Sequence, residues 1–151
     1  MRPGQCHVRE VDQQLGLVLP DASCTPGAID PAVTQANIQQ TICTTGYTGG
    51  IRPPASVTDT FKQQALAEYG LPYDRSTEYD HLVSLQLGGA NAVSNLWPEP
   101  NRSGAPGTTN PKDAVENSLH RAVCSGRITL AEAQLAIATD WTTADAKLGL
   151  K

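Results

Sequence analysis

The stretch STEYDHLVSLQLGGANAVSNLWPEP, residues 76–100, decides the fold of this chain. Its first strand-like run ends on an acid and a histidine, Asp80 and His81. An apolar run, the pair Gly88-Gly89 and an Asn-Leu pair follow before two prolines close the segment. A plain hairpin needs alternating apolar residues and a turn, but no Asp-His pair. We therefore predict two short antiparallel strands, at 76–83 and about 93–97, with polar chemistry beside them.

Helices are predicted on both sides of this hairpin. Before it, Asp30-Pro31 indicates the start of a helix that runs to about Gly46. Ser56 and Gly70 bound a second helix with an apolar stripe. After the hairpin, Pro111 opens the clearest helix, at about 111–124, and a Thr-x-x-Glu capping box opens the last one, at about 130–140.

The 151 residues fit one domain with a sizeable core. We expect an α+β fold, mostly helical, with a short antiparallel hairpin. Its parts are an irregular segment at 1–29 that holds one short strand at 15–19, a helical leader at 30–71, a strand-strand-helix core at 76–126 and a C-terminal helix at 129–141. Trp97 and Trp141 are expected in the core.

Charge limits the partners that composition alone can indicate. The net charge is −4, with only 11 Lys and Arg residues, so binding to a polyanion would depend on local positive charge or a bound cation. No apolar run approaches the roughly 20 residues of a spanning helix, and we expect no membrane partner.

The four cysteines, Cys6, Cys24, Cys43 and Cys124, form no C-x-x-C pair. An even, widely spaced set favours two disulfides in an oxidising compartment, with three pairings open. We therefore favour a secreted or periplasmic protein whose signal has been removed. A cytoplasmic phage or bacterial protein with free thiols is the alternative.

Residues suited to phosphodiester hydrolysis gather around the hairpin. A histidine such as His81 can deprotonate water near neutral pH. A carboxylate such as Asp80 and an imidazole such as His120 can hold a divalent cation that neutralises the phosphate. The amide of Asn95 could orient the base. Adjacent strand residues face opposite ways, so Asp80 and His81 must lie at a strand end to converge.

These blocks resemble the HNH, or ββα-metal, endonucleases. YDHLVSLQLGGANAVSNLWPEP, followed by KDAVENSLHRAVCSGRITLAEAQLAIATDW, is similar to a bacterial and phage subfamily with a DH…LGG…NLWPEP…ENxLHxxVCSG pattern. The resemblance spans roughly residues 22–142 and implies a ββα-metal nuclease core at 76–126.

The resemblance also implies roles. His81 stands at the position of the general base, and Asn95 at that of the residue that orients it. Asp80 and His120 match the metal ligands, and Glu116, one turn before His120, is a further ligand or a partner of one. The expected enzyme is a DNA endonuclease that uses one divalent ion, with RNA as an alternative substrate.

Departures from the family pattern refine this expectation. Asp80 stands where many members have His, which favours Mg²⁺ or Mn²⁺ over Zn²⁺ or Ni²⁺. Arg121, Lys112 and Arg102 flank the expected site and are candidate substrate contacts, although a solvated charge is the ordinary interpretation of each.

Two other functions remain open. The chain could be a secreted, disulfide-stapled binding module that keeps the ββα element as a scaffold, or the metal could be purely structural.

Overall fold

The computed structural model describes the chain except residues 1–3, 13–14, 52–54, 71–76, 101–110 and 151. The fold is mixed α/β, with two small antiparallel sheets of two strands each among several helices. Within these described residues, no helix is both long and apolar enough to cross a membrane.

The expected hairpin is present. Strand β3 (Thr77–His81) pairs antiparallel with β4 (Leu96–Pro100), and Asp80 lies opposite Trp97. The second strand begins three residues later than the sequence predicts, because residues 93–95 form a 3-10 turn, η3 (Val93–Asn95). A second such turn, η2 (Leu85–Leu87), occupies the connection after β3.

The Gly-Gly pair after η2 is required by packing. Gly88 has φ +78°, in the left-handed region that favours glycine. A Cβ on Gly89 would lie 1.7 Å from the main-chain oxygen of Val83. The loop can therefore fold back on the end of β3 only with glycine at position 89.

The later helices agree with the sequence. Helix α2 (Ala55–Tyr69) ends before Gly70, and α3 (Lys112–Cys124) and α4 (Leu130–Asp140) follow the hairpin. Thr129 Oγ1 accepts from Glu132 N, and a Glu132 oxygen accepts from Thr129 N, so the predicted capping box is confirmed. After α4 the chain continues into η4 (Trp141–Thr143) and α5 (Ala144–Lys147).

The N-terminal third differs from the expectation. The predicted strand at 15–19 is present as β2 (Leu17–Leu19), but it pairs with an unexpected strand, β1 (Arg9–Asp12). The helix expected from Asp30 is wrong: only η1 (Gln35–Gln40) and the short α1 (Tyr47–Ile51) form. Asn37 explains this, since its side chain bonds Thr34 N and the Ala32 carbonyl and so competes with a regular helix.

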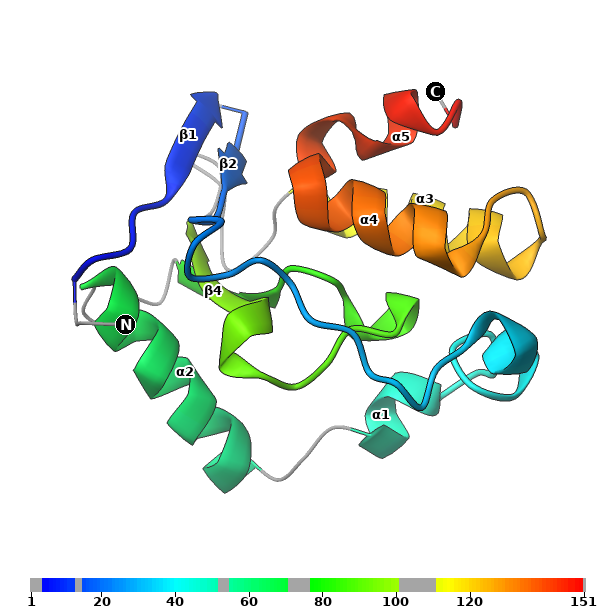
Figure 1. Cartoon of the computed structure of the whole chain (residues 1–151), viewed down its shortest axis with the longest axis horizontal. Coiled ribbons are helices and arrows are strands. Elements are labelled where there is room, and N and C mark those ends of the chain that lie inside the picture. The colour runs from blue at the N-terminus through cyan, green and yellow to red at the C-terminus, as the bar shows by residue number, and fades with distance from the viewer. Residues whose placement is uncertain (1–3, 13–14, 52–54, 71–76, 101–110, 151) are drawn as a thin grey trace.

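The core joins these elements into one body. It contains both tryptophans, Trp97 and Trp141, with the apolar faces of α3 and α4. Helix α2 packs on the β4 side of the hairpin, whereas α3 and α4 lie next to each other on the other side (Figure 1). Two disulfides are present, Cys6–Cys24 and Cys43–Cys124, which is one of the three pairings that the sequence left possible.

Candidate active site

The end of β3 and the start of α3 form the candidate site. Asp80 and His81 are the last two residues of β3, and Lys112 is the first residue of α3. Cross-strand partners share a face of a hairpin, so Asp80 lies on the same face as Trp97 and Glu99. All three are buried. Trp97 Nε1 donates to Asp80 Oδ2 at 3.0 Å, which fixes the carboxylate.

The ammonium group of Lys112 lies at the centre of this cluster. Its Nζ is 2.8 Å from Asp80 Oδ2 and 2.6 Å from Glu116 Oε2. It also donates to the main-chain oxygen of His81 at 3.0 Å. An ammonium has three N–H donors, so these three oxygens match its capacity. With none of its surface exposed, Lys112 is a buried cation held by the ends of β3 and α3.

Carboxylates outnumber this cation. Burial alone would lower the pKa of Lys112, but the charges of Asp80, Glu116 and Glu99 outweigh it and raise that pKa. Burial raises the pKa of Glu116 to about 7, against the effect of Lys112 and with a contribution from Asp80. Burial and then Asp80 also raise the pKa of Asp113. Glu116 and Asp113 therefore hold a proton more readily than exposed carboxyl groups do.

The main-chain oxygen of His81 belongs to this cluster, and its side chain is half-buried. Its Nε2 is 2.9 Å from Oδ1 of Asn91. Because an amide oxygen only accepts, Nε2 carries the hydrogen and Nδ1 is the basic nitrogen of the neutral ring. The side chain of Asn91 is thus the one that orients the ring of His81, which was the role predicted for Asn95.

Asn95 has a different role from the one predicted for it. Its Oδ1 accepts from the main-chain nitrogens of Val83 and Ala28, and its Nδ2 donates to the carbonyls of Val83 and Ala90. The side chain is fully buried. These four bonds hold the loop between β3 and β4, so Asn95 shapes the site without orienting the base.

His120 is not brought to Asp80. It is eight residues after Lys112 on α3, which is two turns or about 12 Å along the axis. Its Nε2 lies 2.7 Å from the Ile42 carbonyl and 3.6 Å from Cys124 Sγ. Glu116, one turn after Lys112, is the residue of α3 that reaches the cation. The expected pairing of Asp80 with His120 is therefore replaced by Asp80 with Glu116.

The three predicted substrate contacts have different outcomes. Lys112 is fully buried, which excludes the surface phosphate contact expected of it. Arg121 is exposed on α3. Arg102 lies outside the described residues.

Two residues of the site were missed from the sequence. Glu99 is fully buried two residues after Trp97, and the period-two alternation of a strand could have placed both on one face. Asn91 sits in the loop, and no sequence signal separates it from an ordinary turn asparagine.

One further cluster offers metal-ligand atoms. Over the described ranges, Cys6, Asp21 and Cys24 are the group of three whose ligand atoms lie within 4.8 Å of one another. The two sulfurs are joined as a disulfide, so neither is the thiolate that a metal requires. We assign no metal to this group.

Comparison with known proteins gives no match among family models, curated proteins or solved structures, so the geometry above carries the functional argument.

Proposed function

We propose that this protein is a metal-dependent endonuclease that hydrolyses phosphodiester bonds in DNA. The observation that carries the proposal is the position of His81 next to Asp80 at the end of β3, where its main-chain oxygen binds the Lys112 of a buried carboxylate cluster. The order β3, β4, α3 supplies the cluster from both strands and the helix, with Asp80, Glu99 and Glu116. Two strands followed by a helix is also the order expected from the family that the sequence resembles, which supports the proposal.

His81 is the general base of the proposed reaction. With its ring held by Asn91 Oδ1, the imidazole would take a proton from a water molecule that attacks phosphorus. The half-buried ring gives that water access from solvent. The main-chain oxygen of the same residue binds Lys112, so the base and the cation cluster are fixed relative to each other.

Asp80 and Glu116 supply hard oxygen donors on either side of Lys112 Nζ. In this proposal one divalent ion would take the place of that ammonium. Asp80 and Glu116 would hold the ion, and oxygen donors favour Mg²⁺ or Mn²⁺ over Zn²⁺ or Ni²⁺. When bound, the ion stabilises the negative charge of the phosphate and the leaving oxygen. Lys112 then has to move from its position between the two carboxylates.

Plasmid nicking tests the proposal. Supercoiled DNA is incubated with the wild-type protein and Mg²⁺, Mn²⁺, Zn²⁺ or Ni²⁺ in turn, and with EDTA. We expect nicked and linear products with at least one ion and none with EDTA. Intact plasmid under every condition would reject the proposal. A parallel RNA substrate identifies the preferred nucleic acid.

The two disulfides favour a second function. They are typical of secreted proteins, and Lys112 already stabilises Asp80 and Glu116 without a metal. A secreted binding module built on the same ββα scaffold is therefore the alternative. It predicts that binding of a partner is unchanged when His81 is replaced by Ala.

A further inference from the structure

The disulfide Cys43–Cys124 has surroundings that Cys6–Cys24 lacks. Cys6 is fully buried and Cys24 is 8 % exposed, whereas both cysteines of the second disulfide are partly exposed. Cys43 follows η1 in the leader, and Cys124 is the last residue of α3. Thiol–disulfide exchange requires access of a thiol to sulfur. The two disulfides therefore differ in the property that decides reactivity.

A pocket of about 180 Å³ lies beside this disulfide. It is lined by residues 42–48, Gln86 and His120, so Cys43 belongs to its wall and Cys124 does not. Threonine, tyrosine, glutamine and histidine give the wall hydrogen-bonding groups. A small polar thiol can enter such a pocket and reach the disulfide from the Cys43 side.

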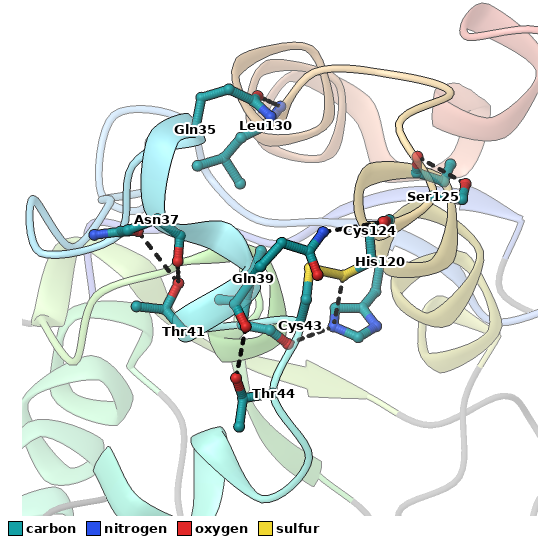
Figure 2. Close-up of a disulfide and its surroundings, with 12 residues drawn as sticks. Gln35, Asn37, Gln39, Thr41, Cys43, Thr44, His120, Cys124, Ser125 and Leu130 are labelled. Atoms are coloured by element: carbon teal, nitrogen blue, oxygen red, sulfur yellow. Dashed lines mark hydrogen bonds between the residues drawn. A yellow bond between two sulfur atoms is a disulfide. The ribbon is translucent and has the colours of Figure 1, made fainter.

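His120 is also part of the pocket wall, and its Nε2 lies near Cys124. Figure 2 shows its ring beside the disulfide, with Nε2 directed at the Ile42 carbonyl and at Cys124. Because the carbonyl only accepts, Nε2 carries a hydrogen. The same N–H is 3.6 Å from Cys124 Sγ and can stabilise a thiolate there.

We propose that Cys43–Cys124 is a thiol-exchange site that takes a small polar thiol of the glutathione class. The thiolate attacks Sγ of Cys43 from the pocket and forms a mixed disulfide with it. The Cys43–Cys124 bond breaks, and its electron pair passes to Sγ of Cys124 beside the His120 N–H. Cys124 then takes up the proton that the attacking thiol released to solvent.

The chain supplies an internal control for this proposal. The folded wild-type protein is incubated with reduced glutathione, free thiols are trapped with an alkylating reagent, and peptides are identified by mass spectrometry. We expect glutathione on Cys43 and the alkyl label on Cys124, while Cys6–Cys24 stays intact. The proposal is overturned if the two disulfides react equally fast, or if glutathione is found on Cys124 with Cys43 labelled.

Two variants test the N–H of the histidine and the space in the pocket. His120→Phe keeps a ring but loses the N–H, and we expect exchange to slow about tenfold, the factor of one hydrogen bond to a charged sulfur. Thr48→Trp, a change in α1, fills part of the pocket and leaves residue 120 unchanged, and we expect glutathione to react several-fold more slowly. Circular dichroism checks that each variant is folded. An unchanged exchange rate in folded Thr48→Trp would contradict the proposal even if His120→Phe does not fold.

Discussion

At the residue scale, Lys112 determines the character of the site. A primary amine near the end of a helix is ordinarily a solvated charge, yet this one is buried among carboxylates. Its long stem lets one residue of α3 reach the end of β3. The ammonium therefore occupies the position between Asp80 and Glu116 that a cation is expected to fill.

Replacing Lys112 by Met removes this charge and keeps the volume. Asp80 and Glu116 would be left buried without their cation, so we expect the free energy of unfolding at pH 7.5 to fall by about 3–5 kcal/mol. Urea denaturation measures the change, and Lys147→Met, at an exposed position, is the matched control.

The same variant reports on metal binding without any activity assay. Mn²⁺ should raise its unfolding temperature more than that of the wild-type protein, because the ammonium no longer competes for the carboxylates. Equal shifts in the two proteins would show that Lys112 does not stand in the cation position.

Glu116 makes the stability depend on pH. Its pKa in the folded protein is about 7, raised mainly by burial from the ordinary 4.5. The folded state therefore keeps a proton that the unfolded chain releases above pH 4.5, and stability falls as pH rises from about 4.5 to 7. Loss of up to about 3 kcal/mol follows from a shift of this size.

Glu116→Gln should remove this contribution. Urea midpoints recorded between pH 4.5 and 7.5 should fall less steeply in the variant than in the wild-type protein. Parallel curves would mean that another group titrates in this range.

At the element scale, two asparagines of the loop between β3 and β4 have different roles. Asn95 holds the loop, and Asn91 orients His81. Asn95→Ala would leave the N–H groups of Val83 and Ala28 and two carbonyls without their partner, and we expect a loss of roughly 3 kcal/mol in stability. Asn91→Ala should change stability little but lower nicking about tenfold or more, because His81 loses its orienting amide. Denaturation and nicking assays on both variants test this division, and the opposite pattern would restore the role predicted for Asn95.

Local signals predicted some elements well and could not predict others. The capping box at Thr129 depends on neighbouring residues alone, so the sequence contains all that determines it. The helix expected from Asp30 failed because Asn37 offers the backbone other partners. The pair Asp80–Glu116 depends on how α3 docks against β3. The spacing of residues along α3 could not distinguish Glu116 from His120 as the partner of Asp80.

At the scale of the whole molecule, Cys43–Cys124 ties the leader to the proposed nuclease core, and Cys6–Cys24 lies within the N-terminal segment. Cys43–Cys124 closes a separation of 81 residues that includes β3 and β4, whereas Cys6–Cys24 closes 18. On loop entropy, replacing both cysteines by Ala should cost about 4 kcal/mol for the longer loop and about 3 kcal/mol for the shorter one. Thermal or urea unfolding of the two double variants measures the difference, and a larger loss for Cys6–Cys24 would contradict the entropic ranking.

The measurement that tests the central claim most directly is the nicking rate of His81→Ala. Its main-chain oxygen still binds Lys112, so the cluster should remain folded, and His7→Ala, at an exposed histidine, is the control. We predict that His81→Ala loses about 10²- to 10⁴-fold in rate with the preferred ion, while His7→Ala keeps the wild-type rate. Folded His81→Ala that nicks plasmid as fast as the wild-type protein would contradict the account.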